Sequence, residues 1–330
     1  MHLSFESVAE DQPGERWQRL FRTRWPHYRK WYLGGNGEER PTYLACERAL
    51  REHVPELVWT WERLVELAGG SDVQARLLSS WCPPGFVVGC SQAVRVAGEP
   101  ILVRNYDYEP RLCDGLFLST AWNGRRVMAA SDCLIGALDG VNDAGLCVSL
   151  SFGGRRDVAP GFGAPLVLRY VLEFCRTTKE ATGVLERVPL HQAYSVTVLD
   201  AEGDHVTVFA GPPGPTRVTR DAVATNHQGE VTWRAHAEAT GSVERERHLL
   251  ALLERADLTN EGLVAAFLAE PLRSSAFDRG FGTLYTAAYR PAARSATYSW
   301  PGVSWTQTTE AFVEGSLRVR VDGRSGVEAG

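Results

Sequence analysis

Residues 89–108, GCSQAVRVAGEPILVRNYDY, bring a cysteine, an arginine and an aspartate into one short segment. Two apolar runs separated by Ala-Gly-Glu predict a hairpin, whose return strand carries Arg104 and Asp107 back toward Cys90. A thiol is mostly protonated at neutral pH, and it becomes a nucleophile when a base or a nearby cation favours the thiolate. We therefore take Cys90 as the candidate nucleophile, with Arg104 and Asp107 as its partners.

The base for this thiol is not obvious, because the segment contains no histidine. A cysteine in a strand has another base within reach, its own α-amino group, if the peptide bond before it is cut. Gly89 suits such a cut because it has no Cβ to obstruct attack on its carbonyl and because it tolerates strained backbone angles. Asp107 would then hold the new amine, and Arg104 would favour the thiolate.

The composition limits the classes of function. The chain has 330 residues, and its formal net charge of −5 argues against nucleic acid or an anionic membrane as the main partner. No stretch approaches the roughly 20 apolar residues of a membrane-spanning helix. The N-terminal residues lack the basic region and the apolar run of a signal peptide. We therefore expect a cytoplasmic protein with no membrane partner.

The seven cysteines are not arranged as a metal site. None form a Cys-x-x-Cys pair, and no histidine pair at helical spacing stands beside them. This pattern predicts free thiols and no bound zinc. Apart from Cys90, we expect the cysteines to be small buried apolar residues.

The elements that must position Cys90 follow from the hydrophobic pattern. Residues 1–80 are predicted to be helical, with Pro41 and Pro55 opening two helices and Gly69-Gly70 closing the second. After residue 85, strands come as antiparallel hairpins, separated by helix pairs at 164–188 and 242–269. The predicted strand segments are 86–96, 100–108, 115–122, 125–131, 134–152, 193–211, 222–227, 282–300 and 316–321. This order predicts an α+β fold of two antiparallel sheets with helices packed outside.

Four stretches together resemble the N-terminal-nucleophile hydrolase superfamily. They are Gly89-Cys90-Ser91, Arg104-Asn105-Tyr106-Asp107, residues 139–152 and residues 224–228. The resemblance is to the cysteine branch, which includes the acyl-coenzyme A:6-aminopenicillanic acid acyltransferases, the penicillin V acylases and the bile salt (choloylglycine) hydrolases. Residues 282–302 also resemble the last strand pair of this superfamily, and the internal position of Cys90 resembles the acyltransferase branch.

The resemblance implies a four-layer αββα sandwich with Cys90 at the end of a strand. It also implies autocatalytic cleavage between Gly89 and Cys90. The two parts would be a helical N-terminal segment, residues 1–89, and a catalytic domain, residues 90–330. The N-terminal segment is expected to stay associated with the catalytic chain.

The resemblance also assigns the site residues. Cys90 matches the nucleophile, and Arg104 and Asp107 match the charged pair that holds the nucleophile and its amine. Asn226 matches the asparagine whose side-chain amide helps to bind the oxyanion. A backbone N–H near Ser151 or Phe152 matches the second donor to the oxyanion. Arg245 matches an arginine near the site, and Arg247 is the alternative for that position.

The implied reaction is cleavage of a linear amide C–N bond through a thioester on Cys90. Water or an amine then takes the acyl group, so the expected partners are a small acyl-amide substrate and, in the case of acyl transfer, an acyl-CoA or an amine acceptor. No metal ion or organic cofactor is required.

Two other hypotheses remain open. One is a Cys-His hydrolase with an uncut chain, in which a histidine such as His227 or His236 acts as the base. The other is a non-catalytic binding or assembly module that keeps the fold. Both predict an intact chain, and they differ in whether Cys90 is reactive.

Overall fold

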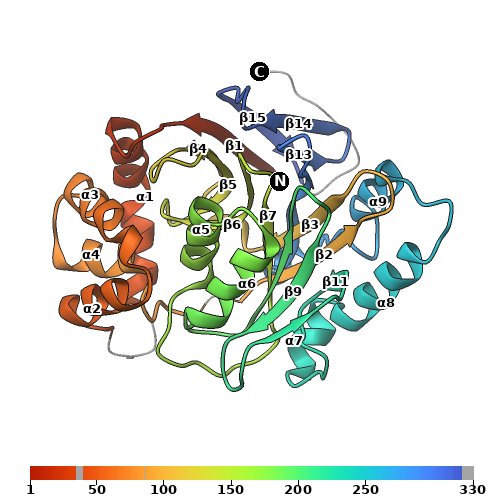
Figure 1. The fold of residues 1–330 in the computed structure, drawn as a ribbon, viewed down its shortest axis with the longest axis horizontal. Helices are drawn as coiled ribbons and strands as arrows, with labels where there is room; N and C mark the ends of the chain where they lie inside the picture. The colour runs from red at the N-terminus through yellow and green to blue at the C-terminus, as the bar shows by residue number, and fades with distance from the viewer. Residues whose placement is uncertain (35–39, 86, 322–330) are drawn as a thin grey trace.

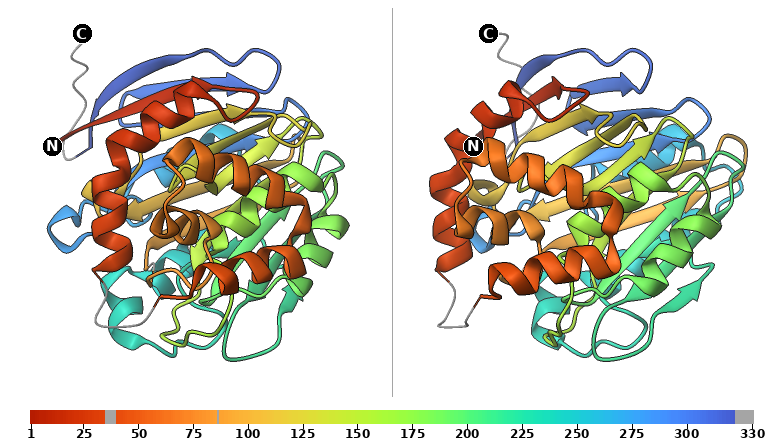
Figure 2. Two further views of the ribbon diagram at one scale, coloured as in Figure 1. Left: turned by 90° about the vertical axis from the view of Figure 1, so that its left-hand side faces the viewer. Right: turned by 60° about the vertical axis from the view of Figure 1, so that its left-hand side comes forward.

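Two stacked β-sheets form the centre of the protein (Figures 1 and 2). The computed structural model describes residues 1–34, 40–85 and 87–321. In these residues the larger sheet has nine strands, in the order β10 (Arg217–Thr219), β9 (His205–Ala210), β8 (Tyr194–Leu199), β7 (Cys147–Phe152), β6 (Gly136–Asn142), β5 (Val127–Asp132), β4 (Leu116–Thr120), β1 (His2–Ala9) and β15 (Gly315–Arg320). Neighbouring strands are antiparallel except for β1 and β4.

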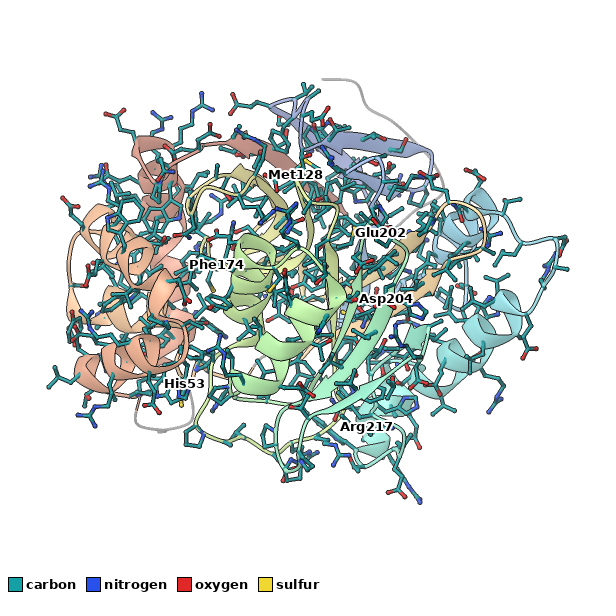
Figure 3. All side chains as sticks on the ribbon, in the orientation of Figure 1. His53, Met128, Phe174, Glu202, Asp204 and Arg217 are labelled. Atoms are coloured by element: carbon teal, nitrogen blue, oxygen red, sulfur yellow. The ribbon has the colours of Figure 1, made fainter. Side chains whose placement is uncertain are left out.

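The smaller sheet carries Cys90. Its six strands in the described part of the chain follow the order β11 (Val223–Ala224), β2 (Gly89–Arg95), β3 (Ile101–Tyr108), β12 (Gly282–Arg290), β13 (Ser295–Trp300) and β14 (Val303–Thr308). The predicted hairpin is confirmed, because β2 pairs with β3 and places Cys90 opposite Tyr106. Strand β2 faces β7 of the larger sheet, and side chains fill the space between the layers (Figure 3).

Helices cover the outer face of each sheet. On the larger sheet, α5 (Ala164–Phe174) packs on β6, and α6 (Thr178–Arg187) packs on β9. On the smaller sheet, α8 (Ser242–Leu253) packs on β2, and α9 (Asn260–Phe267) packs on β3. The short helix α7 (Arg234–Ala239) packs against α8. The chain therefore forms the predicted α+β fold, an αββα sandwich of four layers.

The N-terminal helices form a group of their own at one side of the sandwich (Figure 1). They are α1 (Glu15–Leu33), α2 (Tyr43–His53), α3 (Val58–Ala68) and α4 (Asp72–Ser79), and short 3-10 turns occur at Pro55–Leu57, Pro110–Leu112 and Phe277–Arg279. The expected signals at Pro55 and Gly69 are confirmed, whereas Pro41 lies before the N-cap and does not open its helix. Thr42 caps α2 one residue after Pro41, Pro55 opens the turn before α3, and Gly69 ends α3 with φ 112°.

The expectation that residues 1–80 are entirely helical is wrong at the N-terminus. Residues 2–9 form strand β1, which lies between β4 and β15 in the larger sheet. The short alternating stretch HLSFESVA carries too few apolar residues to signal a strand by itself, and it is Phe5 that packs in the core. The N-terminal segment thus contributes one strand to the large sheet and then forms a group of helices.

Other elements differ in detail from the sequence expectation. The stretch DGVND at 139–143 is typical of a turn, but Asp139, Gly140 and Asn142 lie inside β6, and only Asp143 belongs to the turn, which covers 143–146. The elements β10, β14 and α7 were not predicted, since they are short or largely polar. Phe86, the first residue of one predicted strand, lies outside the described residues. No helix within residues 1–34, 40–85 or 87–321 combines the length and the apolar character that a membrane crossing needs.

Candidate active site

Cys90 lies in β2 between the two sheets and is completely buried. Residues two apart on a strand share a face, so Cys90 and Gln92 face the interior together with their partners Tyr106 and Arg104 on β3. The Arg104 guanidinium donates a hydrogen bond from Nη2 to the Cys90 Sγ atom at 3.3 Å. The hairpin therefore brings Arg104 to the thiol, as the sequence predicted.

Arg104 is held by a buried polar network. It forms an ion pair with Asp139 of β6, and its Nε donates to the Leu150 carbonyl oxygen at 3.0 Å. The Tyr285 and Tyr289 hydroxyls also donate to the Asp139 carboxylate. Burial disfavours the Arg104 cation, but the nearby Cys90 and Asp139 charges raise its pKa well above the ordinary value. The guanidinium is therefore a fixed positive charge beside the thiol.

The thiol itself is neutral in this environment. Burial raises the pKa of Cys90, and the charge of Asp107 adds to this effect. The Arg104 charge and the hydrogen bonds from Arg104 and from the Asp107 backbone act in the opposite direction without overcoming burial. A thiol in this environment thus needs a base before it can act as a nucleophile.

Asp107 lies on the other face of the hairpin. Its carboxylate accepts hydrogen bonds from Arg245 Nη1 and from Thr283 Oγ1, each at 2.6 Å. Arg245 is almost fully buried in α8, whereas Arg247 is exposed, so Arg245 is the arginine at the site. Burial raises the pKa of Asp107 and Arg245 opposes that shift. The Cys90 peptide N–H donates to Asn226 and not to Asp107, and the role of Asp107 toward a free Cys90 amine stays a prediction.

Asn226 binds the backbone of Cys90 at both polar groups. Its Oδ1 accepts from the Cys90 N–H at 2.9 Å, and its Nδ2 donates to the Cys90 carbonyl oxygen at 2.9 Å. The Asn226 N–H donates in turn to Ser242 Oγ at 2.8 Å, and Ser242 also contacts His227 Nδ1 at 2.8 Å. This asparagine is therefore held in place from the N-terminal end of α8.

Gly89 lies in a tightly packed position without backbone strain. It lies in the extended strand β2, outside the set of residues with positive φ, so the expected use of strained angles is not seen. A Cβ at this position would lie 3.2 Å from Thr240 Cγ2 and 3.4 Å from both Asp107 Cβ and Phe281 Cδ1. A side chain here would therefore press on Thr240, and that neighbour would have to shift by a few tenths of an ångström.

Ser151 and Phe152 are close to this group at the end of β7. They pair with Ser195 and Tyr194 of β8, and Ser151 Oγ donates to the Thr225 carbonyl oxygen at 2.7 Å. Thr225 precedes Asn226, so this contact connects the end of β7 with the asparagine. A role for either backbone N–H in binding an oxyanion stays a prediction.

The histidines have other partners. His227 Nε2 lies 3.2 Å from Glu246 Oε2, and its Nδ1 contacts Ser242. His236 packs edge-on against Phe152, with ring centroids 5.0 Å apart. Among the described residues, neither histidine hydrogen-bonds to the Cys90 thiol. This arrangement does not favour the Cys-His hypothesis.

Several residues of the site were missed from the sequence. Asp139 was attributed to a turn, and Ser242, Thr283, Tyr285 and Tyr289 gave no motif that marks a polar residue for burial. The available signal was the Asp139-Gly140 pair within an apolar stretch, because a buried aspartate in a strand requires a cationic partner. The expectation for the other cysteines holds for Cys46, Cys147 and Cys175, whereas Cys82, Cys113 and Cys133 are partly exposed.

A family model matches the chain over residues 94–305, which is more than half of its length. The model is described as acyl-coenzyme A:6-aminopenicillanic acid acyl-transferase. The matched region contains Arg104, Asp107, Asn226 and Arg245 and begins four residues after Cys90. No curated protein matches the chain.

Solved structures resemble this one at low sequence identity. A Caenorhabditis elegans N-acylethanolamine-hydrolyzing acid amidase ortholog is 18% identical with a TM-score of 0.49, over 70% of this chain and 100% of that chain. Penicillin V acylase from Agrobacterium tumefaciens is 15% identical with a TM-score of 0.43, over 69% and 91%. A mutant conjugated bile acid hydrolase from Clostridium perfringens is 12% identical with a TM-score of 0.39, over 72% and 95%.

Proposed function

The chain belongs to the acyl-coenzyme A:6-aminopenicillanic acid acyl-transferase family, and we propose that it is a self-processing cysteine amidohydrolase or acyltransferase. The proposed reaction opens a linear amide C–N bond through a thioester on Cys90. The observation that carries the proposal is the gathering of Cys90, Arg104 and Asn226 from separate segments around one buried thiol. A purely structural cysteine does not need a buried cation and a backbone clamp, since burial alone stabilises it.

The proposed activation is cleavage between Gly89 and Cys90. Cys90 Sγ attacks the Gly89 carbonyl carbon, the C–N bond breaks, and the nitrogen gains a proton to become the α-amine of Cys90. Water then hydrolyses the resulting Gly89 thioester, which leaves a carboxylate on Gly89 and a free thiol on Cys90. The uncut chain buries Cys90 completely, so this step would also open the thiol to substrate.

In the proposed turnover, the new α-amine takes the proton of the Cys90 thiol as the thiolate attacks the substrate carbonyl. Arg104 stabilises the thiolate from 3.3 Å. An amide –NH2 group has two N–H donors, so Asn226 Nδ2 has one for the Cys90 carbonyl and one for the oxyanion. The amine product leaves with a proton, and water or an acceptor amine resolves the thioester.

The N-terminal segment is proposed to stay with the catalytic chain after cleavage. Support comes from β1, in which Phe5 pairs with Leu317 of β15 and Glu6 pairs with Leu116 of β4. The N-terminal segment thus completes a sheet whose other strands follow the cleavage point. Cytoplasmic location and an acyl-CoA or amine acceptor remain predictions.

The two alternatives have less support. A Cys-His enzyme needs a histidine at the thiol, and Arg104 is there instead. A binding module would not require the buried Arg104–Asp139 pair beside Cys90, because two charges are costly to remove from water.

The test is direct detection of the thioester. The purified protein is mixed with a p-nitrophenyl ester and quenched in acid, and the mass of the chain that begins at Cys90 is measured. The proposal predicts one added acyl group, removed by hydroxylamine and absent in a Cys90→Ala variant. Acylation of a residue other than Cys90 would contradict the proposal. The absence of any acylation, in a protein whose Cys90 is free and exposed, would contradict it as well.

A further inference from the structure

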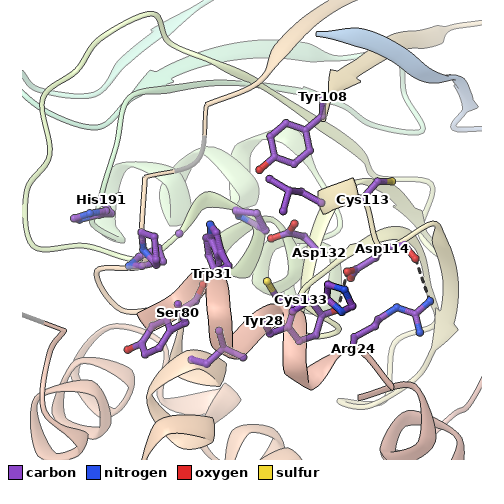
Figure 4. Close-up of a pocket in the computed structure, with 18 of the residues that line it drawn as sticks. Arg24, Tyr28, Trp31, Ser80, Tyr108, Cys113, Asp114, Asp132, Cys133 and His191 are labelled. Atoms are coloured by element: carbon purple, nitrogen blue, oxygen red, sulfur yellow. Dashed lines mark hydrogen bonds between the residues drawn. The ribbon is translucent and has the colours of Figure 1, made fainter. Parts of the chain in front are cut away.

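A cavity of about 280 Å³ lies between the N-terminal helices and the end of the sandwich nearest to Cys90 (Figure 4). Its walls include aromatic side chains of α1, β3 and β8, among them Trp31, Tyr108 and Tyr194. This volume is close to the lower end of small-molecule sites, about 300 Å³. The cavity is therefore suited to a small organic group rather than to a macromolecule.

The cavity adjoins the catalytic centre through its inner wall. Tyr108 lies two residues beyond Tyr106, which is opposite Cys90, and the two tyrosine rings are 5.7 Å apart. Burial raises the pKa of Tyr194, and the charges of Asp132 and Cys90 both add to that shift. Tyr194 is thus within electrostatic reach of the nucleophile and of the acid inside the cavity.

Two carboxylates, Asp114 and Asp132, face this cavity, and they differ in their partners (Figure 4). Asp114 accepts hydrogen bonds from the Tyr28 hydroxyl at 2.6 Å, from Ser131 Oγ at 3.2 Å and from the Leu134 N–H at 3.3 Å. Asp114 is therefore a structural acid that ties α1 to the turn after β5.

Asp132 has a weaker partner. Its contact within the described part of the chain is the Cys133 thiol, a poor hydrogen-bond donor. Burial raises the pKa of Asp132 to about 7, and the Asp114 charge acts in the same direction. A cation beside Asp132 would relieve both effects, because it would attract the two carboxylates at once.

The basic side chains of the cavity do not supply that cation. Arg24 donates to the Asp114 backbone carbonyl at 3.1 Å. Arg111 pairs with Glu109, and its side chain is 87% exposed. His191 is occupied by the Ala159 carbonyl oxygen at 2.6 Å, and His27 lies exposed on α1. Among residues 1–34, 40–85 and 87–321, Asp132 thus has no arginine partner, and it lies in a cavity lined by aromatic rings.

We propose that this cavity binds the part of the substrate that carries a protonated amine, with the ammonium group donating to Asp132 and lying against the rings of Trp31, Tyr108 and Tyr194. The inference rests on the proposed function and narrows its substrate class to amides with a cationic amine remote from the scissile bond. Aromatic faces attract cations, and a hydrogen bond between charged groups is stronger than one between neutral groups.

The test uses matched pairs of amides that differ at one terminal group, an ammonium in one and an isosteric methyl in the other. One series carries the ammonium on the acyl side, and a second series carries it on the leaving amine, each over several chain lengths. In one of the two series, the self-cleaved wild type is expected to show kcat/KM about tenfold higher for the ammonium substrate. Asp132→Asn is expected to bring that ratio close to one. Asp257→Asn, which removes an exposed acid paired with Arg255, is the control of equal charge change and should keep the wild-type ratio.

A binding measurement covers the case in which no substrate turns over. Calorimetry of the uncut Cys90→Ala chain with n-alkylammonium ions and with the matching alkanols measures the preference directly. Tighter binding of the ammonium ion that is lost in Asp132→Asn supports the inference. If the ammonium ion and the alkanol bind equally well while the wild type cleaves itself and forms the thioester, the inference is overturned. The proposed function is then unaffected. An uncut chain with an unreactive Cys90 overturns the proposed function and the inference with it.

Discussion

The side-chain amide of Asn226 makes the two hydrogen bonds to the Cys90 backbone that a neighbouring strand would otherwise make. The β11–β2 ladder pairs Ala224 with Gln92, and two residues further along the same register Asn226 would pair with Cys90. At that step the Asn226 side-chain amide, rather than its backbone, bonds to the Cys90 N–H and carbonyl at 2.9 Å each. Cutting the bond before Cys90 would therefore free the amine without removing the contacts that hold it.

Two substitutions of Asn226 are predicted to distinguish the effects of its two contacts with the Cys90 backbone, one to the N–H and one to the carbonyl oxygen. Asn226→Asp keeps an acceptor for the Cys90 nitrogen and loses the Nδ2 donor, so turnover should fall by about a hundredfold or more. Asn226→Ala loses both contacts and should also slow self-cleavage. The measurements are kcat/KM on an activated amide and the rate of chain cleavage. Asn260→Asp is the matched control, since it also loses an amide donor to a carbonyl, that of Glu99. Equal turnover in Asn226→Asp and wild type would contradict this role.

The Arg104–Asp139 pair is predicted to be strongly coupled. Both side chains are fully buried, so Arg104→Met alone leaves an unpaired carboxylate and should lower the free energy of unfolding by about 3–5 kcal/mol. In the double variant with Asp139→Asn, the loss should be smaller than the sum of the single losses by at least about 1 kcal/mol. Urea unfolding in a Cys90→Ala background measures all four proteins as single chains. Additive losses would show that the two side chains do not form a coupled pair.

Ser242→Ala is predicted to act through Asn226. The variant removes the acceptor of the Asn226 N–H and the partner of His227, and an unsatisfied buried N–H costs about 1–3 kcal/mol. We expect lower kcat at nearly unchanged KM, because the oxyanion donor loses its position while the binding surface stays. Ser7→Ala, which removes a buried hydroxyl bonded to the Val313 carbonyl, is the control with no such effect on kcat. A change in KM alone would contradict a positioning role.

His236 is predicted to make the fold sensitive to mild acid. Burial lowers the pKa of His236 from 6.5 to about 4, so the unfolded chain takes up a proton at a pH where the folded chain does not. The free energy of unfolding should therefore fall as the pH drops from about 6.5 to about 4, by up to about 3 kcal/mol in total. His236→Phe, measured by urea unfolding at several pH values, should lose less stability than wild type over this window. Parallel pH profiles of the two proteins would contradict the prediction.

The local patterns of the chain were sufficient to predict most of the fold. The hairpin of β2 and β3 followed from two apolar runs and a short turn, and the two ends of the helical segment around α3 followed from Pro55 and Gly69. Strand β1 was missed because its stability comes from pairing with β4 and β15, which are far away in the sequence. Such long-range pairing leaves no local signal.

The site was predictable where its residues lie in one hairpin and less so elsewhere. Cys90 and Arg104 are joined by strand register, and the structure confirms that they meet. Asp107 pairs with Gly89 in the same hairpin, and its side chain contacts Arg245 of α8, a partner that strand register alone does not indicate. The partner of Arg104, Asp139, comes from the other sheet, and only the packing of the two layers brings them together.

The most direct test of the account is the intact mass of the purified protein beside a Cys90→Ala variant. The account predicts that the wild type separates under denaturing conditions into chains 1–89 and 90–330, and that the variant stays as one chain of 330 residues. A wild type that remains uncut, or a variant that is cut at the same bond, would contradict self-processing by Cys90.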